Sequence, residues 1–234
     1  MVNFTMLVHN RPKLTLQAIR SLQGTKDITI SILNDASDCE GMDLRRWTVN
    51  YIHPENKVLL TTNTVSKGTA AARNQVIADS ETFFGRGDYL YLSDNDVFFL
   101  GPDWLDFLLG CYESAWNRGF KVLGAYNHPY HQPMASYRTG LGYEVREVAA
   151  LALQSMLMRW DVWDTYGPFP MTAPGKVCQG EDVEFSRRIV SDGGKLGVIS
   201  PQLLVNTGIT NSFGDKIPGW ELVAAQAPEG VIVE

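Results

Sequence analysis

The sequence predicts a single α/β domain whose core is a mixed, mainly parallel sheet flanked by helices. Short apolar runs alternate with longer amphipathic stretches along the chain, which is typical of strands joined by helices. Hydrophobic residues make up 44% of the 234 residues and charged residues 20%, so the chain can bury one large core. No internal repeat or linker divides it, and we therefore expect one domain from 1 to 234.

Apolar and β-branched runs bounded by polar residues or glycine mark the expected strands. Six such runs cover residues 4–8, 28–33, 58–60, 89–92, 122–125 and 148–158. Because helical patterns separate most of the first five, we expect these strands to form most of the parallel part of the sheet.

The expected helices carry apolar side chains on one face. Leu14, Ala18 and Leu22 recur at four-residue spacing behind Pro12, and residues 104–115 repeat this pattern behind a second proline. Further helical segments are expected at 69–84, at 160–166 as a short amphipathic turn, and at 182–191, where two glycines follow. From Tyr126 to the glycines at 140 and 142 the pattern is irregular, which predicts a long loop.

Charge and composition narrow the classes of partner. The net charge of −6 gives no basic surface for nucleic acid, so no stable nucleic-acid complex is expected. No apolar run approaches 18 residues and the N-terminus lacks a secretory pattern, so we expect a cytoplasmic protein without a transmembrane segment. Cys39, Cys111 and Cys178 are scattered, which favours reduced thiols over a disulfide framework or a zinc site.

Two carboxylates follow an expected strand directly. The run 89–92 leads into Ser93, Asp94, Asn95 and Asp96, after which apolar residues resume. Ligands of open α/β sheets bind beyond the carboxyl ends of the strands, and two hard oxygen ligands suit Mg²⁺ or Mn²⁺. Aspartate and asparagine also favour surface turns, so the motif alone leaves both interpretations open.

A second acidic pair, Glu181 and Asp182, stands at the start of an expected helix. Acidic residues at this position commonly cap the helix and interact with its dipole. A carboxylate there could also serve as the general base for an acceptor hydroxyl. The residues alone do not separate these roles.

Taken together, the segments resemble the family 2 glycosyltransferases. The resemblance is an ordered set of motifs over about residues 4–210, more specific in order and spacing than any one motif. The motifs are Asn10-Arg11-Pro12, the sequence Ile-Leu-Asn-Asp-Ala-Ser at 32–37, Lys67-Gly68, Ala72-Arg73-Asn74, Ser93-Asp94-Asn95-Asp96, residues 158–169, and Gly180-Glu181-Asp182. Members of this family have the Rossmann-like GT-A fold and mostly invert configuration at the sugar carbon.

The resemblance implies a nucleotide-diphosphate sugar as donor and a divalent cation, Mn²⁺ or Mg²⁺, as cofactor. It implies that Asp35 binds the nucleotide base near the backbone of Val8 to Asn10, and that Arg73 lies close to the phosphates or ribose. The full set of implied donor-binding residues is Val8, Asn10, Asp35, Lys67, Arg73, Asp94 and Asn95. Asp94 and Asp96 match the Asp-x-Asp metal motif, with Asp96 as the more usual direct ligand.

The resemblance also implies the catalytic and acceptor-binding residues. Asp182 matches the base that deprotonates the hydroxyl of a glycan or other acceptor, and Glu181 would orient that acceptor. Trp160 flanks the acceptor side, where its ring could stack on a sugar. Many family members carry a third metal ligand, a histidine, after the last core strand. Here that neighbourhood reads Leu-Val-Asn-Thr-Gly at 204–208, and Asn206 could supply an amide oxygen in its place.

By the same resemblance, residues 1–100 form a nucleotide-binding half and 101–216 an acceptor-binding half. The tail 217–234 is expected to be a loosely packed end, an oligomer contact or a lid over the acceptor. Three alternatives remain at this stage: a GT-A transferase that retains configuration, a nucleotidyltransferase, and a catalytically inactive nucleotide-sugar-binding module. The absence of a glycine-rich basic loop at the first strand disfavours the nucleotidyltransferase.

Overall fold

The computed structural model describes residues 1–126, 133–171, 180–208, 216 and 220–234. In chain order the elements are β1 (Val2–Val8), α1 (Pro12–Ser21), β2 (Ile28–Asp35), α2 (Leu44–Tyr51), β3 (Lys57–Asn63), α3 (Thr69–Phe84), β4 (Tyr89–Asp94), β5 (Val97–Phe99), α4 (Trp104–Trp116), β6 (Phe120–Gly124), β7 (Ala135–Arg138), β8 (Glu144–Val148), β9 (Ser155–Arg159), α5 (Trp160–Tyr166), α6 (Glu181–Ser191), β10 (Lys195–Ser200), β11 (Leu204–Asn206) and α7 (Trp220–Ala224).

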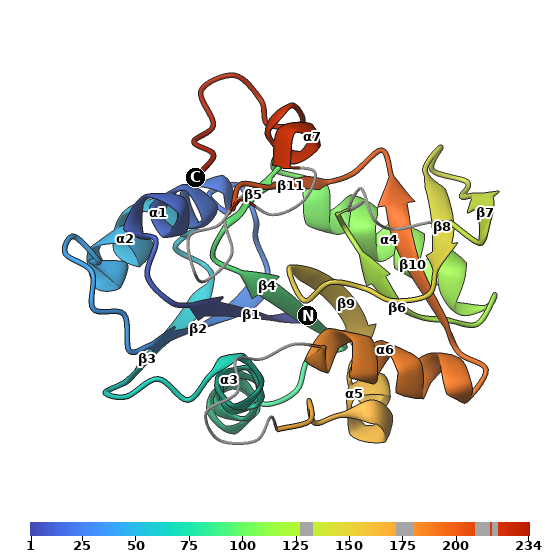
Figure 1. Cartoon of the computed structure of the whole chain (residues 1–234), viewed down its shortest axis with the longest axis horizontal. Helices are drawn as coiled ribbons and strands as arrows, with labels where there is room; N and C mark the ends of the chain where they lie inside the picture. The colour runs from blue at the N-terminus through green and yellow to red at the C-terminus, as the bar shows by residue number, and fades with distance from the viewer. Residues whose placement is uncertain (127–132, 172–179, 209–215, 217–219) are drawn as a thin grey trace.

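A nine-stranded sheet crosses the whole molecule in the order β3-β2-β1-β4-β9-β6-β10-β8-β7 (Figure 1). The first four strands are parallel neighbours, and β6 and β10 form another parallel pair. β9 joins the two halves by antiparallel pairing to β4 and β6, and β8 and β7 close the far side. The predicted mixed α/β sheet flanked by helices is confirmed, with the parallel pairing concentrated in its first half.

Helices cover both faces of this sheet because the strands expose apolar side chains on both sides. Every residue of β1 is buried, as expected for a central parallel strand. One apolar cluster packs α1, α2 and α4 on one face, and another packs α3, α5 and α6 on the other. Figure 1 shows α3, α5 and α6 together below the sheet.

The expected strand at 148–158 is wrong, since two strands share this run. Val148 ends β8, and β9 begins only at Ser155. The residues between them are apolar because they pack as a buried loop: Leu151 is 2% exposed and its backbone N–H donates to the Ser186 hydroxyl in α6. Apolar composition here reflects burial of a loop and not strand pairing.

The predicted long loop after Tyr126 also needs correction. Residues 127–132 lie outside the described part of the chain, but β7 and β8 then form an antiparallel hairpin at the edge of the sheet.

Helix α2 was missed by the sequence pattern because it spans only eight residues with few buried positions. The carboxylate of Asp43 caps this helix by accepting a hydrogen bond from the backbone N–H of Arg46.

The end of the chain is hydrogen-bonded to the domain, and the residues of the expected tail whose burial is described are exposed or half-buried. Backbone groups of Ile232 exchange hydrogen bonds with the side chain of Gln17 in α1. Glu234 forms an ion pair with Lys13, and its backbone N–H donates to the carbonyl of Thr207 beside β11. Within the described residues, no helix combines the length and apolar character needed to cross a membrane.

Candidate active site

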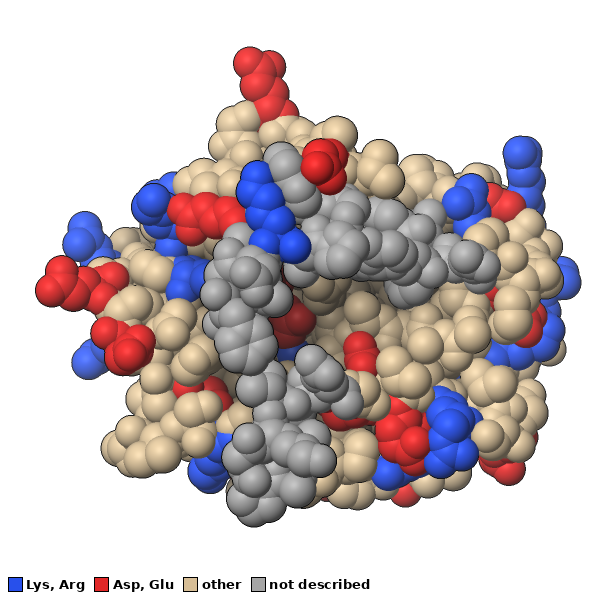
Figure 2. Space-filling model, viewed as in Figure 1, with Lys and Arg blue, Asp and Glu red and all other residues tan. Residues whose placement is uncertain are grey.

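The carboxyl ends of four parallel strands meet at one edge of the sheet. The register pairs Leu7 of β1 with Asp94 of β4, and Val8 with Asn34 of β2. Ligands of open α/β sheets bind at this edge, which collects Val8, Asp35 and Asp94 as the sequence predicted. Figure 2 shows acidic side chains in a hollow near the middle of this view of the molecule.

Asp94 ends β4 and is held from behind by Arg73. The guanidinium of Arg73, which is 0% exposed, donates to Asp94 Oδ1 and, at 2.7 Å, to the carbonyl of Ser93. The Asp94 side chain remains 28% exposed. Arg73 therefore fixes Asp94 from inside the protein, whereas the resemblance implied that it lies close to the donor phosphates.

Asp96, two residues further along the chain, is paired with Arg11 from the start of α1. Arg11 Nη1 lies 2.5 Å from Asp96 Oδ2, and the other carboxylate oxygen is buried without a hydrogen-bond partner among the described residues. Burial and the charge of Asp94 together raise the pKa of Asp96 to about 6, although the charge of Arg11 opposes this rise. The single positive charge of Arg11 therefore does not fully offset the burial of Asp96 and its repulsion by Asp94.

The turn between β1 and α1 aims Arg11 at Asp96. Both Asn10 and Arg11 adopt left-handed backbone conformations, with φ of 56° and 55°, which are costly for residues other than glycine. Asn95 secures the turn, because its side-chain amide donates to the carbonyl of Asn10 at 3.1 Å and to the Thr15 hydroxyl at 2.7 Å. The buried Asn95 side chain therefore has a structural role, while its predicted contact with the donor stays a prediction.

Strand β11 brings Asn206 next to the acidic pair. Asn206 pairs with Val97, and the backbone N–H of Thr207 donates to the carbonyl of Asp96 at 2.7 Å. The amide oxygen of Asn206, the predicted metal ligand, already accepts from the backbone N–H of Gly208 at 2.8 Å. Its nitrogen and the hydroxyl of Thr207 are buried without hydrogen-bond partners in the described structure.

Gly208 packs directly on the Arg11–Asp96 pair. A Cβ atom at this position would lie 2.1 Å from Asp96 Oδ2 and 2.4 Å from Arg11 Nη1, so any side chain would collide with the ion pair. The sequence motif gave no role to Arg11 or Gly208. Arg11 stands inside the Asn10-Arg11-Pro12 motif, but its left-handed backbone and the close approach of Gly208 to Asp96 arise only in the folded chain.

Asp35 organises the loop that leads into α3. Its carboxylate accepts hydrogen bonds from the side chains of Asn63 and Ser66 and from the backbone N–H groups of Lys67 and Gly68. Burial alone would raise the pKa of Asp35, but these four donors outweigh it and hold the pKa below the ordinary value. A nucleotide base that bonds Asp35, as predicted, would have to share its carboxylate oxygens with these four donors.

The other predicted residues of the donor side lie around this loop. The Lys67 ammonium is bonded to Gln75 at 2.8 Å on the exposed side of α3. The side chain of Asn10 faces the β2 end, where its oxygen accepts from the backbone N–H of Asp38. Val8 is fully buried, so only its backbone could contact a ligand.

The second acidic pair begins α6. Glu181 is buried, and the Asp182 carboxylate accepts from the backbone N–H of Val183 at 2.8 Å. Burial raises the pKa of Asp182, and the charges of Glu181 and of Asp94 raise it further. The start of α6 therefore lies close enough to the end of β4 for the charge of Asp94 to act on Asp182.

Trp160 does not belong to this site, and its predicted contact with an acceptor is wrong. It follows Arg159, which pairs with Tyr89 at the amino end of β4 and thus at the opposite edge of the sheet from Asp94. Its ring is 5% exposed and its Nε1 donates to the side chain of Asn3 at 3.0 Å. A tryptophan buried in this way has no face available for a sugar.

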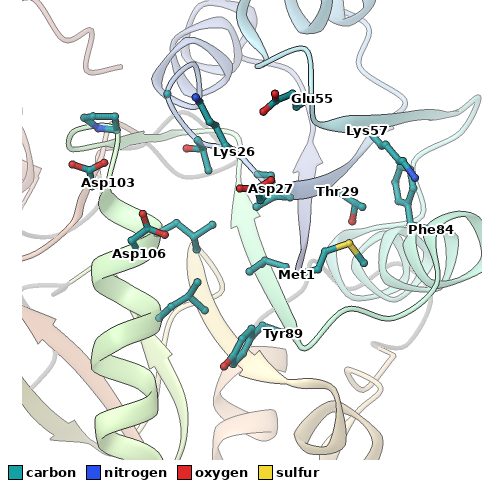
Figure 3. A pocket seen from close by; sticks show the side chains of 17 residues that line it. Met1, Lys26, Asp27, Thr29, Glu55, Lys57, Phe84, Tyr89, Asp103 and Asp106 are labelled. Carbon is teal, nitrogen blue, oxygen red and sulfur yellow. The ribbon is translucent and has the colours of Figure 1, made fainter.

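A cavity of about 780 Å³ lies at that opposite edge (Figure 3). The first residues of the four parallel strands, Val2, Ile28, Lys57 and Tyr89, contribute to its lining. Acidic and basic side chains are mixed around it, and none of the buried polar atoms without a hydrogen bond in the described structure lines it. Its volume is therefore a weaker indication of chemistry than the acidic pairs and unpartnered atoms at the carboxyl edge.

The residues at the carboxyl edge fit a divalent cation. The buried, unpartnered oxygen of Asp96 and the part-exposed carboxylate of Asp94 offer hard oxygen ligands. Among the described residues, no histidine, cysteine or further acidic residue lies close enough to act as a third ligand beside these two carboxylates. Such an ion would need water or phosphate oxygens to complete its coordination, which Mg²⁺ commonly accepts.

Comparison with known proteins supports the fold. No protein-family model matches the chain, and no curated protein matches it either. Its structure is similar to that of S. aureus TarS 1-349, with a TM-score of 0.57 and 14% identity over 87% of this chain and 59% of that one. The same TarS piece in complex with UDP gives a TM-score of 0.59 at 14% identity, with the same coverage of both chains.

A longer TarS chain matches with a TM-score of 0.57 and 12% identity, over 87% of this chain and 36% of that one. The present chain thus spans less than two thirds of each of these TarS chains. At such low identity the likeness shows the fold alone, which is the predicted mixed α/β sheet flanked by helices.

Proposed function

We propose that the protein is a glycosyltransferase that moves a sugar from a nucleotide-diphosphate donor to an acceptor hydroxyl with inversion of configuration. The observation that supports the proposal is the position of Asp94 and Asp96 at the carboxyl end of β4, together with Asp182 at the start of α6, whose pKa the charge of Asp94 raises. One pair of carboxylates suits a metal-bound diphosphate, and a separate carboxylate suits a base.

The donor side of the proposal uses Asp94 and Asp96 as ligands of Mn²⁺ or Mg²⁺. When bound, the ion supplies the positive charge that stabilises the departing diphosphate. Arg73 keeps Asp94 in position, since its buried guanidinium bonds both the carboxylate and the carbonyl of Ser93. Asp35 holds the loop at Lys67 and Gly68 beside the donor.

On the acceptor side, Asp182 takes the proton of the incoming hydroxyl. Burial and neighbouring acidic groups raise its pKa, which makes its carboxylate a stronger base than an exposed aspartate. A base opposite the leaving group is what in-line displacement with inversion requires. Glu181, buried beside it at the helix start, would orient the acceptor.

The similarity to TarS supports a nucleotide donor, because one of the matching structures is a complex with UDP. The proposal for this chain is therefore a uridine diphosphate sugar as the first donor class to examine. A retaining transferase would not need Asp182 as a base, and the configuration of the product at the anomeric carbon separates the two mechanisms. An inactive binding module would bind nucleotide without turnover.

Calorimetric titration with UDP, GDP, CDP and dTDP, each with and without Mn²⁺ or Mg²⁺, tests the donor site. We expect metal-dependent binding of one nucleotide, which Asp96→Ala abolishes. Asp106→Ala is the matched control, because it removes the same charge from an exposed position in the lining of the opposite cavity. Binding that is lost in the control and kept in Asp96→Ala would contradict the proposed site.

The base is tested with Asp182→Asn. This variant should bind the nucleotide as the wild type does but lose transfer, measured as nucleotide release from the sugar donor with a panel of hydroxyl acceptors. The reason is that asparagine keeps the size of the side chain and cannot take up the proton. Unchanged transfer by Asp182→Asn would rule out this residue as the base.

A further inference from the structure

We infer that Arg11 competes with the divalent cation for Asp96 and binds the diphosphate of the donor once it has left that carboxylate. The inference rests on the proposed function and adds a residue that the motifs do not assign to the donor site. It begins from the short contact between Arg11 Nη1 and Asp96 Oδ2, 2.5 Å. A guanidinium thus already bonds the carboxylate proposed as the principal metal ligand.

The two arginines of the site differ in the exposure of their side chains. Arg73 is 0% exposed and bonds both Asp94 and a backbone carbonyl, so its guanidinium is fixed inside the protein. The Arg11 side chain is 25% exposed, and the Asp96 side chain 13%. The Arg11 guanidinium is therefore less enclosed than that of Arg73, so a ligand can reach it more easily.

The backbone at Asn10 and Arg11 is held by hydrogen bonds. A change of partner from Asp96 to a diphosphate therefore requires movement of the Arg11 side chain alone. The carbonyl of Arg11 accepts from both the backbone N–H and the hydroxyl of Thr15, each at 2.9 Å, while Asn95 bonds the carbonyl of Asn10. Two consecutive left-handed residues maintain this turn at a cost of about 1–3 kcal/mol each in general, and such strain gathers at ligand sites. The strained turn keeps the guanidinium within reach of both Asp96 and a bound diphosphate.

Space around the ion pair is limited on the side of β11. Gly208 approaches so closely that a Cβ atom would meet both charged groups. On Asp96 itself, one oxygen is bonded to Arg11, while the other is buried and has no hydrogen-bond partner in the described structure. Asp96 can therefore accept a metal ion at its second oxygen while Arg11 still bonds the first, but the two cations would then lie close together.

Charge decides which cation Asp96 keeps. A guanidinium and a divalent ion on one carboxylate repel each other strongly over a few ångströms. A guanidinium also forms strong paired hydrogen bonds with phosphate oxygens, so a bound diphosphate offers Arg11 a better partner. Removing Arg11 should therefore have opposite effects on two ligands: the metal ion alone binds more tightly, and the nucleotide binds more weakly.

The experiment measures both affinities in the full chain. Binding of Mn²⁺ alone is followed by the paramagnetic resonance signal of the free ion, and binding of UDP at saturating Mn²⁺ by calorimetry. We expect Arg11→Gln to bind Mn²⁺ about tenfold more tightly and UDP about tenfold more weakly than the wild type, as loss of one close charge implies. Arg11→Lys keeps the charge, so its Mn²⁺ affinity should stay near that of the wild type while UDP binding falls.

Arg45→Gln is the matched control, because Arg45 is exposed on α2 and the substitution changes the net charge equally. It should leave both affinities unchanged. If Arg11→Gln weakens both ligands or strengthens neither, Arg11 only supports the fold and the inference fails while the proposed function stands. Circular dichroism checks that each variant folds. If Arg11→Gln does not fold, Arg11→Lys serves instead, and a fall of its affinities for both Mn²⁺ and UDP overturns the inference. Wild type that binds no nucleotide with any metal ion overturns the proposed function itself, and the inference with it.

Discussion

Replacing Asp35 by asparagine tests how the fold builds the donor side of the site. The carboxylate accepts from four residues, with Asn63 Nδ2 at 2.8 Å on one oxygen and Ser66 Oγ at 2.7 Å on the other. Asparagine has one acceptor oxygen, so its amide nitrogen must face some of these donors. In the best orientation it donates to Ser66, and the N–H of Gly68 loses the carboxylate and keeps only its contact with the Ser66 hydroxyl at 3.3 Å.

The expected loss is one hydrogen bond to a charged group together with the charge itself. Hydrogen bonds to charged groups contribute about 1.5–3 kcal/mol each, so we expect Asp35→Asn to lower the free energy of unfolding by about 2–3 kcal/mol. For a chain of this length that corresponds to a melting temperature about 4–12 °C lower. UDP binding should weaken as well, because the loop at Lys67 and Gly68 loses its anchor.

The deficit should depend on pH in a defined direction. The pKa of Asp35 in the folded protein lies below the ordinary value of 3.8. A carboxyl group of this kind stabilises the fold at pH values above its unfolded pKa and loses that contribution as pH falls through its folded pKa. The stability difference between wild type and Asp35→Asn should therefore be full at pH 5 to 7 and shrink below pH 3.8.

Thermal melts followed by circular dichroism at several pH values measure this difference. Asp38→Asn is the matched control, because Asp38 is exposed three residues further on. We expect the control to melt within about 1 °C of the wild type, as surface substitutions generally do. A melting temperature of Asp35→Asn equal to that of the wild type, or a deficit that does not change below pH 3.8, would refute the reasoning.

Three further substitutions probe separate contacts. Gly208→Ala adds a Cβ atom 2.1 Å from Asp96 Oδ2, so it should cost about 1–3 kcal/mol and weaken UDP binding; normal melting and calorimetry would show that the glycine is not required. Arg73→Met leaves Asp94 without its buried partner and should cost about 3 kcal/mol in chemical denaturation, and a cost below about 1 kcal/mol would contradict this. Trp160→Phe removes one buried hydrogen bond, about 1 kcal/mol, and should leave the transfer rate unchanged; a large loss of transfer would restore its predicted acceptor role.

The fold could be predicted from sequence wherever local periodicity and burial agree. Helix α1 and helix α3 fall where amphipathic spacing and helix propensity expected them, and β4 runs into Asp94 as the apolar run 89–92 indicated. The run 148–158 misled because a buried loop and a buried strand have the same composition. The β7–β8 hairpin was missed because its strands are short and lie at the sheet edge.

For the site, sequence order was informative and lateral packing was not. Asp94 and Asp182 stand in motifs that keep their spacing, so both acidic pairs could be proposed before the structure. The contact of Arg11 with Asp96 joins residues 85 apart in the chain, and it depends on a left-handed turn that the letters Asn-Arg-Pro do not reveal. Trp160 was assigned to the acceptor side by resemblance, and only the strand register put it at the other edge.

Hydrogen–deuterium exchange with and without UDP and Mn²⁺ tests most directly whether the carboxyl edge of the sheet is the donor site. The account predicts slower exchange on ligand addition at residues 8–11, 93–96 and 204–208, which surround Asp96. It predicts no change at residues 24–29 and 103–109 around the opposite cavity. Protection confined to the cavity segments would contradict the account, because the nucleotide would then bind at the wrong edge of the sheet.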